Sequence, residues 1–589
     1  MIVLGVMPST LNIGDNMDTP YKIYSTLELV KEVLDPTEPI FTDTETCGFY
    51  QKIRLFQAYQ PHLNHVILVE WPDPIQLAVF LNGYNSVWQN AHYDITTIQQ
   101  QSNTRWIPEH FEDTLYLARL HYYLQEKFAL DETFIYTLGY CPYTRQKLDK
   151  KVLQKANWGV KVLSTDQLLY AATDVCYLPQ LWEAVKGYLD DFNYKLDMLT
   201  VRYCLDFQWN GMPVSKDKLY ERYEANVERL EELNLPINVN SYQQVRKFLD
   251  CTESDALALT TMKLKGDVKA GEILEARKII KQNSFLDKFD TIDGRIFGKF
   301  LPSARSGRLT SKDQNLQQLP RKLKGAFEAE EGKALWYADY PQVELRSISA
   351  ITKCLTMIKL FREGKDVHGF TAEGLFGKAW TKAQRQLTKT YNFNLLYGGG
   401  INMIIGILIK EAEILMTEKQ ATKDRRKWRS LWKEIFDWQE KGIAQWKKGR
   451  HGSTPMGRRY KAKMMTDQLN IENQGCAADI FKLALHYMYP KLKEYNEIHH
   501  IGLKICNVIH DSFIIEGDNK EEHYEPVSVI IAEAMQESWF EISKALPVKD
   551  IPMPIDIKVG TNWGDIEDDD IPNLYDYQLE GMALCKTMS

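Results

Sequence analysis

Asp339 is the residue of this 589-residue sequence whose surroundings best suit metal-assisted chemistry. It ends the apolar run Leu335–Ala338, which predicts a buried strand, and Pro341 cannot continue a central strand because it has no N–H to donate. We expect a helix to begin at Pro341, since a missing N–H costs nothing at the first helical position. A carboxylate at the end of a rigid strand can hold a divalent cation against a phosphate. Taken alone, an aspartate at this place is better explained as a helix cap.

Asp511 is the second candidate, at the polar tip between two apolar runs of the stretch 504–516. Two β-type runs around a short polar tip predict a β-hairpin. The hairpin would hold Asp511 rigidly, and Asp339 and Asp511 together would form the metal pair of a phosphoryl-transfer site. The neighbouring His510 would lie within reach of a nucleic-acid strand being extended at that site.

Arg385, Lys389, Phe393 and Tyr397 recur at every fourth position, so they share one face of a predicted helix that the glycines at 398–400 end. Cations at the early turns suit the phosphates of a nucleoside triphosphate, and aromatic rings at the later turns suit its sugar and base. An ordinary amphipathic helix would carry mostly aliphatic residues on this face. We therefore favour nucleotide binding over a purely structural role for this face.

Three further polar residues are candidates for contacts with nucleic acid. Arg308 lies in the basic loop 304–311 and suits a phosphate or a minor-groove edge. The amides of Asn470 and Gln474, in a segment that opens another predicted helix, suit base edges or sugars. Positive charge is concentrated between residues 299 and 463, which favours a groove that follows phosphates, although such runs are usually solvated surface.

A second set of carboxylates lies in the first third of the chain. Asp43 and Glu45, two positions apart in a predicted strand, project from the same face. Asp94 stands near the start of a predicted helix, and Tyr170 and Asp174 share a face of another helix that an N-cap signal precedes. Singly, each acid is better explained as a surface residue or a cap. Four converging carboxylates would repel one another unless two metal ions neutralised them, and Tyr170 could then orient an activated water.

Composition excludes several classes of protein. The net charge of -7 and the pI near 6.0 exclude a polycation that binds nucleic acid indiscriminately. Nine cysteines without a C-x-x-C pair argue against a zinc site and a secreted disulfide framework. The apolar N-terminus is too short for a signal peptide, and the run Ile401–Ile409 is too short to cross a bilayer. We therefore expect a cytoplasmic protein without a membrane segment.

Length and the remaining segments indicate several domains. A chain of 589 residues with 44% hydrophobic content can form more than one core. Residues 216–289 are charged and have helical periodicity, which alone would fit any helical linker. The tail after Asp565, which carries the acidic run 567–570, could bind a partner, but disorder explains it better.

The order D-x-E, N-x-x-x-D, Y-x-x-x-D in the first third resembles the 3′–5′ proofreading exonucleases of the DEDD type that carry a tyrosine in the last motif. The resemblance implies a ribonuclease-H-like α/β fold for about residues 20–190. It also implies a catalytic set of four metal-binding carboxylates and a water-orienting tyrosine: Asp43, Glu45, Asp94, Asp174 and Tyr170.

Across about residues 35–565 the chain resembles the family A DNA polymerases, the bacterial DNA polymerase I type. D-Y-P-Q-V-E-L-R resembles motif A, R-x-x-x-K-x-x-x-F-x-x-x-Y-G resembles motif B, and H-D-S resembles motif C. S-G-R-L-T-S with N-L-Q-Q-L-P, and N-x-x-x-Q-G-x-A-A-D, add matches in the same order. Several independent motifs in one order are far more specific than any one of them.

The resemblance implies three groups of residues in the polymerase part. The metal ligands would be Asp339, Asp511 and the carbonyl of Tyr340. The nucleotide site would comprise Arg385 and Lys389 at the triphosphate, Phe393 near the sugar, Glu344 against a ribose 2′-hydroxyl, and Tyr397 at the template position. Primer or template would be contacted by Arg308, Asn470, Gln474 and His510.

The sequence departs from the family pattern at three positions. Pro341 replaces the usual serine, which the expected helix start tolerates. Asn394 replaces the usual glycine after Phe393, and Ser512 replaces the usual glutamate of motif C. The loss of that glutamate removes a charge beside the metals and leaves rate and metal preference open.

The whole is expected to be an α/β multidomain protein with an exonuclease domain over residues 1–192 and a right-hand polymerase domain over 193–589. The polymerase would have a thumb (about 213–298), a palm (about 299–355 and 455–565), fingers (about 356–454) and an acidic C-terminal tail (566–589). It would use two Mg²⁺ ions per active site, with Mn²⁺ as a possible substitute.

The expected partners are primer–template DNA and dNTPs, and replisome proteins such as a helicase, a primase and a single-strand binding protein; the chain itself would act as a monomer. With no N-terminal 5′-nuclease domain and no long thumb insertion, the arrangement looks phage-like by analogy, which would put the enzyme in the host bacterial cytoplasm.

Two alternatives stay open on the sequence. A single-subunit RNA polymerase shares the palm, but Glu344, Phe393 and the exonuclease motifs argue against it. A degenerate polymerase that only binds DNA is suggested by Ser512, but the retention of both aspartates and of Lys389 argues against it.

Overall fold

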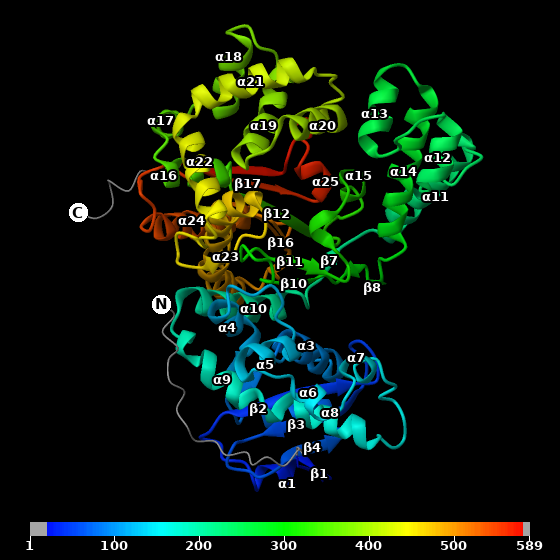
Figure 1. Cartoon of the computed structure of the whole chain (residues 1–589), viewed down its shortest axis with the longest axis vertical. Helices are drawn as coiled ribbons and strands as arrows, with labels where there is room; N and C mark the ends of the chain where they lie inside the picture. Colours follow the sequence, from blue (N-terminus) through cyan, green and yellow to red (C-terminus); the bar gives the residue numbers. More distant parts are fainter. Residues whose placement is uncertain (1–19, 581–589) are drawn as a thin grey trace. The chain divides into compact units, whose positions relative to one another are not determined.

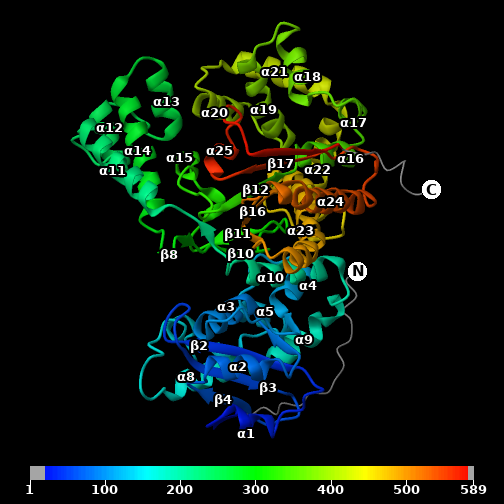
Figure 2. The same ribbon diagram turned by 180° about the vertical axis from the view of Figure 1, so that it is seen from behind.

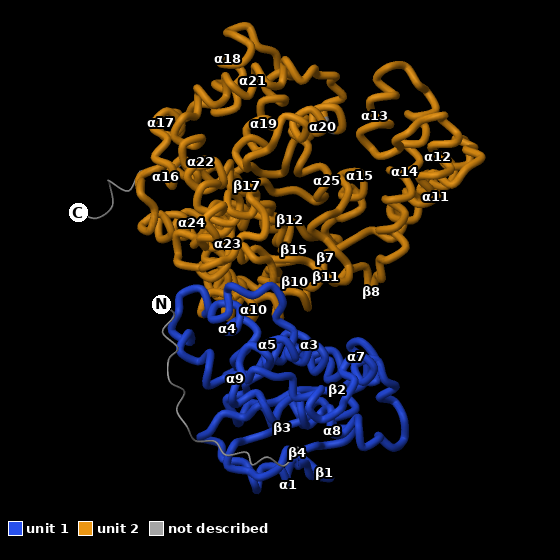
Figure 3. Tube along the Cα trace, viewed as in Figure 1, with its two compact units in different colours: residues 1–194 blue, residues 195–589 orange. Residues whose placement is uncertain are grey.

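The computed structural model describes residues 20–580. The chain divides into two compact units, residues 1–194 and 195–589 (Figure 3), and helix α10 (Phe192–Phe207) runs across the boundary. Within residues 20–580, no helix combines the length and the apolar character needed to span a membrane.

Unit 1 is built on one six-stranded sheet. Its strands are β1 (Tyr21–Tyr24), β2 (Ile40–Thr46), β3 (Ile53–Tyr59), β4 (Val66–Glu70), β5 (Ser86–Trp88) and β6 (Phe111–Asp113). They lie in the order β1-β4-β3-β2-β5-β6, with β3 antiparallel to both neighbours and the other pairs parallel. Figure 1 labels the first four of these, β1, β4, β3 and β2. The interior strands β3 and β4 are almost wholly buried, as expected for strands covered on both faces.

The helices of unit 1 pack against this sheet or against one another. They are α1 (Leu27–Lys31), α2 (Pro74–Leu81), α3 (Ala91–Ser102), α4 (Thr114–His121), α5 (Leu130–Leu138), α6 (Pro142–Arg145), α7 (Lys150–Leu153), α8 (Thr165–Cys176) and α9 (Leu178–Val185). Helix α8 crosses β2, β3 and β4. Its start is fixed by a capping box of Ser164 and Gln167, which confirms the predicted N-cap. The predicted strand carrying Asp43 and the helix carrying Asp94 are confirmed as β2 and α3.

Unit 2 has a five-stranded antiparallel sheet at its centre. The strands are β12 (Lys333–Asp339), β15 (Lys504–Ile509), β16 (Ser512–Asp518), β17 (Ile555–Gly560) and β18 (Tyr575–Leu579), in the order β15-β16-β12-β17-β18. Strand β12 is therefore the central strand, and β15 with β16 forms a hairpin whose tip is His510 and Asp511. The predicted strand and the predicted hairpin are both confirmed.

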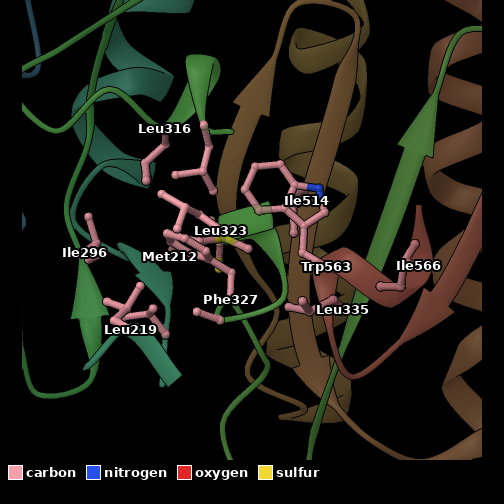
Figure 4. Close-up of a cluster of buried hydrophobic side chains, with 14 residues drawn as sticks. Met212, Leu219, Ile296, Leu316, Leu323, Phe327, Leu335, Ile514, Trp563 and Ile566 are labelled. Carbon is pink, nitrogen blue, oxygen red and sulfur yellow. The ribbon is translucent and has the colours of Figure 1, made fainter. Parts of the chain in front are cut away.

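The two faces of this sheet bury different partners because side chains alternate along each strand. Leu335 and Ile514 belong to a cluster that also contains Met212, Phe327 and Trp563 (Figure 4). The opposite face is covered by α23 (Met465–His499) and α24 (Tyr524–Ser543), where the rings of Phe481 and Phe513 stack with centroids 4.2 Å apart. Burial on both faces fixes β12, the strand that carries Asp339.

Short strands link the sheet to the rest of unit 2: β7 (Met212–Pro213), β8 (Thr291–Ile292), β9 (Arg295–Ile296), β10 (Lys299–Leu301), β11 (Thr310–Lys312), β13 (Gly452–Ser453) and β14 (Arg459–Tyr460). The remaining helices are α15 (Arg321–Lys324), α16 (Val343–Thr352), α17 (Leu355–Arg362), α18 (Val367–Phe376), α19 (Lys382–Leu396), α20 (Ile401–Ala412), α21 (Glu418–Leu431), α22 (Lys433–Lys447) and α25 (Trp563–Ile566). Helix α19 confirms the predicted helix that carries Arg385 to Phe393.

Four helices form an arm, which confirms the helical prediction for residues 216–289. They are α11 (Lys216–Leu233), α12 (Tyr242–Leu249), α13 (Ala256–Leu264) and α14 (Val268–Leu286). Each begins after a serine or aspartate whose side chain accepts a hydrogen bond from a backbone N–H of the first turn: Ser215, Ser241, Asp255 and Asp267. The arm has its own apolar core, with Val245, Leu259 and Ile273 fully buried.

The end of the arm touches α20. Helices α13 and α20 lie side by side in both views (Figures 1 and 2). A Cβ on Gly406 of α20 would be 3.6 Å from Leu257 Cδ2 of α13, which is ordinary van der Waals contact. Lys263 Nζ lies 2.5 Å from Glu413 Oε1 just after α20. The arm and the α20 region are therefore joined by an apolar contact and an ion pair.

Three sequence predictions about element boundaries are wrong. Helix α16 begins at Val343 and not at Pro341, because Gln342 takes a left-handed conformation (φ 58°); proline followed by a positive φ is typical of a type II turn. Helix α23 begins at Met465, five residues before Asn470. Disorder is wrong for the described part of the C-terminal segment, since β18 pairs with β17. Residues 581–589 lie outside the described residues.

Two candidate active sites

The carboxylates of unit 1 converge where α8 crosses β2. Asp43 and Glu45 come from β2 and Asp174 from α8, and one carboxylate oxygen of each lies within 4.8 Å of the others. Alternation along the strand puts Asp43 and Glu45 on the same face, as the spacing predicted. Three oxygen donors at this separation suit a hard divalent cation.

Asp94 joins the group through the backbone of β2. Its carboxylate accepts hydrogen bonds from the amide of Thr44, at 3.1 Å, and from the Thr44 hydroxyl, at 2.6 Å. Thr44 lies between Asp43 and Glu45, so these bonds fix Asp94 beside them. The structure thus brings all four predicted carboxylates together, with Thr44 as a positioning residue that the sequence reading missed.

Burial makes this group of acids reluctant to ionise. Burial, and then the charges of the neighbouring carboxylates, raise the pKa of Asp43 and of Glu45 well above the ordinary range. Burial also raises the pKa of Asp94 and of Asp174 to about 7, although each accepts hydrogen bonds that lower it. Among residues 20–580, no lysine or arginine forms an ion pair with Asp43 or Glu45. The donor set therefore fits a divalent metal ion that would supply the missing positive charge.

Two tyrosines line the same group. Tyr170, on α8, is buried, and its ring stacks on that of Tyr143 with centroids 5.5 Å apart. The Tyr143 hydroxyl, from α6, donates a hydrogen bond to Asp174. Burial raises the pKa of both tyrosines, so both stay protonated. Tyr170 was predicted here and Tyr143 was not, because nothing in its local sequence places α6 beside α8.

Asp339 and Asp511, the metal pair predicted for the second site, lie together in unit 2. Asp339 ends β12 directly opposite Ser512, so Asp511 is the next residue along the hairpin. Burial and the charge of Asp511 raise the pKa of Asp339 well above its ordinary value. Burial and the charge of Glu344 raise the pKa of Asp511 to about 6. Two desolvated carboxylates, one at the end of a buried strand and the other at the adjoining hairpin tip, are the donor set expected of a divalent-metal site.

A cavity of about 420 Å³ opens at these two aspartates. Its lining includes three acids and three permanent cations: Asp339, Glu344, Asp511, Arg308, Arg385 and Lys389. Tyr340, Phe393 and His510 complete the predicted residues that line it. The hydroxyl of Tyr340 donates a hydrogen bond to the carbonyl of Met535 at 2.7 Å. This hydroxyl is therefore engaged in the protein interior, and Tyr340 lines the cavity with its other atoms.

Helix α19 presents its cations to this cavity. Arg385 lies on the early part of the helix and forms an ion pair with Asp366, the N-cap residue of α18. Lys389 and Phe393 follow at one-turn intervals, and the ring of Phe393 lies 6.0 Å from that of His368. The predicted face of the helix is therefore the face that lines the cavity. A triphosphate could displace Asp366 and take up the charge of Arg385 and Lys389.

Glu344 is the most heavily bonded residue of the cavity. Its carboxylate pairs with the guanidinium of Arg308 and accepts a hydrogen bond from the Tyr397 hydroxyl. Its backbone carbonyl accepts a hydrogen bond from Asn473 Nδ2 at 3.0 Å, and Asn473 Oδ1 accepts another from Ser347 at 2.6 Å. These contacts fix the side chain that was predicted to crowd a ribose 2′-hydroxyl.

Three predicted residues lie outside the cavity lining: Tyr397, whose hydroxyl reaches Glu344, and Asn470 and Gln474. Asn470 and Gln474 are half-buried on α23, one turn apart. The α23 residue that reaches the site is Asn473, which was not predicted. Gln342 and His368 also line the cavity and were not assigned a role. The side-chain oxygen of Gln342 is buried without a hydrogen-bond partner, and His368 Nδ1 lies 3.0 Å from Asn392 Nδ2.

Comparison with known proteins agrees with this geometry. The sequence profile of DNA polymerase family A matches residues 214–565, and a 3′–5′ exonuclease profile matches residues 20–190. DNA polymerase I of Aquifex aeolicus is 28% identical over 571 residues, covering 88% of this chain and 95% of that protein. The thermostable DNA polymerase I of Thermus thermophilus is 28% identical over 383 residues, covering 58% of this chain and 43% of that protein.

A solved structure has the same fold. The POL domain of Pol1 from M. smegmatis, in complex with DNA primer-template and dNTP, superimposes with a TM-score of 0.72 at 18% identity, covering 92% of this chain and 99% of that chain. The expected fold class, an exonuclease domain followed by a polymerase domain of mixed α/β structure, is confirmed.

The chain belongs to DNA polymerase family A. It is a DNA polymerase of the DNA polymerase I kind that also contains a 3′–5′ exonuclease domain. Both kinds of domain depend on divalent metal ions, in keeping with the carboxylate cluster of unit 1.

Proposed function

We propose that Asp339 and Asp511 are the catalytic metal ligands of a template-directed DNA polymerase that transfers nucleotides from dNTPs to a primer 3′-hydroxyl. The observation that supports this most is the position of both aspartates in one cavity with Arg385 and Lys389. The carbonyl of Tyr340, the residue directly after Asp339, is assigned as a further ligand. Two Mg²⁺ ions, or Mn²⁺ in their place, would lower the pKa of the attacking hydroxyl and neutralise charge on the leaving pyrophosphate.

The residues of the chain would position the reactants around that metal site. Arg385 and Lys389 bind the triphosphate, and Lys389 is also placed to donate a proton to the leaving group. Phe393 packs against the sugar, and Glu344 occupies the space that a 2′-hydroxyl would need. Tyr397 closes the template side through its hydrogen bond to Glu344.

The primer–template contacts are part of the same proposal. Arg308 and His510 line the cavity and would contact the primer end, while Asn470 and Gln474 of α23 would contact DNA outside the cavity. The M. smegmatis structure, which contains DNA primer-template and dNTP, supports binding of both ligands. In this proposal the arm is the thumb (about 213–298), the five-stranded sheet belongs to the palm (about 299–355 and 455–565), and α17–α22 belong to the fingers (about 356–454).

Unit 1 would remove mispaired primer ends. Asp43, Glu45, Asp94 and Asp174 would hold two divalent ions, and the protonated hydroxyl of Tyr170 would orient the attacking water. Tyr143 would hold Asp174 in place through its hydrogen bond. Hydrolysis would release one deoxynucleotide from the 3′ end at each turnover.

A role in phage DNA replication, as a monomer beside a helicase, a primase and a single-strand binding protein, is also proposed. It rests on analogy alone, since the relatives reported above are bacterial DNA polymerase I proteins. Disruption of the coding gene should then stop viral DNA synthesis while host replication continues; undiminished viral synthesis would contradict the phage role.

The proposed function is tested with the purified chain on a primed template. Each dNTP and each rNTP is supplied singly with Mg²⁺, on a paired and on a mismatched 3′ end. We expect addition of the complementary dNTP to the paired end, little use of rNTPs, and removal of the mismatched nucleotide before extension. Absence of extension with both Mg²⁺ and Mn²⁺ would overturn the proposal, and preferential use of rNTPs would favour an RNA polymerase.

A further inference from the structure

A cluster of four charged side chains is buried inside unit 2, apart from the cavity lining. Asp197 of α10 accepts hydrogen bonds from Arg458 Nη1 and Nη2, at 2.8 and 2.9 Å, and from Lys482 Nζ, at 2.8 Å. Asp479, one turn before Lys482 on α23, lies 3.0 Å from Lys482 Nζ and 3.8 Å from Arg458 Nη2. The side chains of all four are at most 9% exposed.

A buried cluster of this kind is costly to assemble. Removing each ion from water costs several kcal/mol, and apolar residues of similar volume often stabilise a fold as well or better. Burial by itself would raise the pKa of Asp197, yet Arg458 and Lys482 hold it below its ordinary value, so the acid is ionised. Such clusters are best attested where they fix one arrangement of neighbouring segments.

The segment that rests on this cluster is the loop between β10 and β11. Gly307 in that loop has φ +84°, and a Cβ there would be 3.1 Å from Arg458 Nε and 3.1 Å from Lys482 Nζ. On the other side, a Cβ on Gly475 of α23 would be 3.1 Å from the carbonyl oxygen of Ser306. The loop backbone therefore lies directly on two basic side chains of the cluster and on the backbone of α23.

The next residue of the loop is Arg308, which extends into the cavity and pairs with Glu344. The charge of Arg308 also lowers the pKa of Asp511 against the effect of burial. A shift of the loop would therefore move Arg308, the cation that pairs with Glu344 and acts on the proposed metal ligand Asp511. Gly307 is the direct link between the buried cluster and this cation.

We propose that Asp197, Arg458, Asp479 and Lys482 are positioning residues for nucleotide addition, which act by holding the Gly307 loop so that Arg308 points into the cavity. The proposal rests on the proposed polymerase function of that cavity. None of the four is a catalytic residue, since none lines the cavity.

The test is a double-mutant cycle between Asp197→Asn and Arg308→Ala in the full chain, with single-nucleotide addition as the measurement. Asp197→Asn leaves the two basic side chains with one acid. We expect kcat/KM for the dNTP to fall about tenfold, which corresponds to a loss of about 1.4 kcal/mol. In the Arg308→Ala background the same change should cost less than about twofold, because the cation it positions is already gone. If the two substitutions lower kcat/KM independently, so that the double variant shows the product of the two single losses, the proposal is overturned.

Two matched variants separate positioning from stability. Val201→Ala removes a fully buried side chain of the same helix, so it should lower the melting temperature without coupling to Arg308→Ala. Gly307→Ala puts a methyl group against Arg458 and Lys482 and should reproduce the tenfold loss with the cluster intact. If Asp197→Asn does not fold, the cycle is run with Gly307→Ala and Arg308→Ala. Independent losses of kcat/KM in that cycle would also overturn the proposal.

The outcome is distinguishable from failure of the proposed function. Single-strand 3′ hydrolysis should be unchanged in all these variants, because it takes place at the carboxylates of unit 1. If Asp339→Asn still adds nucleotides, the proposed function fails, whatever Asp197→Asn does. If Asp339→Asn is inactive and Asp197→Asn matches the wild-type chain, only the positioning role fails.

Discussion

The two sites use acidic side chains in opposite electrostatic surroundings. In unit 1, Asp43 and Glu45 are joined by Asp94 and Asp174, and the described residues supply no ion-pair partner to Asp43 or Glu45. In unit 2, the acids of the cavity are matched in number by Arg308, Arg385 and Lys389. The first site therefore has no cation paired with Asp43 or Glu45, although the nearby charge of Lys150 lowers the pKa of Asp174, whereas the lining of the second site already holds as many cations as acids.

This difference indicates how each site reaches its working state. The acids of unit 1 need cations before they can all ionise, so metal binding alone organises that site. The cations of unit 2 line the same cavity as Asp339, and Arg385 is held by Asp366. A metal-bound triphosphate would bring positive charge to the aspartates and negative charge to these cations, so that site would be completed by substrate.

The largest expected effect comes from a substitution in the unit 2 cavity, which should affect nucleotide addition and not 3′ hydrolysis. Asp339→Asn should lower nucleotide addition by about 10³-fold or more, since several kcal/mol of charge stabilisation depend on the metal ligands. Hydrolysis of single-stranded DNA should be unchanged. Primer extension and 3′ hydrolysis are measured on the same preparation. Asp556→Asn is the matched control, since Asp556 is the cross-strand neighbour of Asp339 but does not line the cavity; equal loss in both variants would contradict the assignment.

The converse substitution tests unit 1. Asp43→Asn with Glu45→Gln should lower 3′ hydrolysis by about 10³-fold and leave nucleotide addition within twofold of wild type. Removing two desolvated carboxylates should also raise the melting temperature of the metal-free chain at pH 8. Hydrolysis of a labelled single strand and thermal unfolding in EDTA provide the two measurements. A comparable loss of synthesis would show that the two sites are not separate.

Substitutions of Glu344 test whether its volume or its charge matters in the unit 2 cavity. Glu344→Ala should raise the use of rNTPs relative to dNTPs by about 10- to 100-fold, because the space it fills becomes available to a 2′-hydroxyl. Glu344→Gln keeps that volume while removing the charge that Arg308 pairs with, so it should retain the discrimination. The ratio of kcat/KM for the two sugars is measured in each variant. If both variants lose discrimination equally, charge rather than volume is responsible.

The smallest expected effect is on the pH dependence of stability. Burial raises the pKa of Asp174 from 3.8 to about 7, so its contribution to stability is present below pH 4 and is lost as the pH rises through 7. The metal-free chain should therefore lose up to about 1.4 kcal/mol per pH unit and per proton over this range. Divalent cations should remove the loss by binding the ionised form.

Thermal unfolding in EDTA between pH 4 and 8 provides the measurement. Asp174→Asn should reduce the slope by the share of one proton, because Asp43, Glu45 and Asp94, whose pKa values are also raised, still titrate. Asp166→Asn, an exposed residue of the same helix, should leave it unchanged. Identical slopes in the two variants would contradict the role given to Asp174.

Much of both sites could be predicted from local patterns. The apolar run before Asp339 and the hairpin around Asp511 depend only on residues within a few positions, and both form as expected. The four-residue repeat of Arg385, Lys389 and Phe393 likewise identified the face of α19 that lines the cavity.

The parts that could not be predicted depend on contacts between distant segments. Sequence spacing placed Asn470 and Gln474 on one face of a helix, but it did not identify Asn473, the α23 residue that donates a hydrogen bond to the Glu344 carbonyl. Tyr143 reaches Asp174 only because α6 packs beside α8. The left-handed conformation of Gln342 could not be predicted from the sequence, because a proline at position 341 is equally compatible with a helix that begins there.

The contact of Leu257 with Gly406 has a topological consequence. It joins the arm to the α20 region, so the sheet, the arm and the helices after α16 form a closed circuit of protein. Parting the circuit at this point means breaking both the packing of α13 on α20 and the ion pair of Lys263 with Glu413. Because that ion pair is exposed, it contributes at most about 1 kcal/mol, so the ion pair alone does little to keep the arm and α20 together.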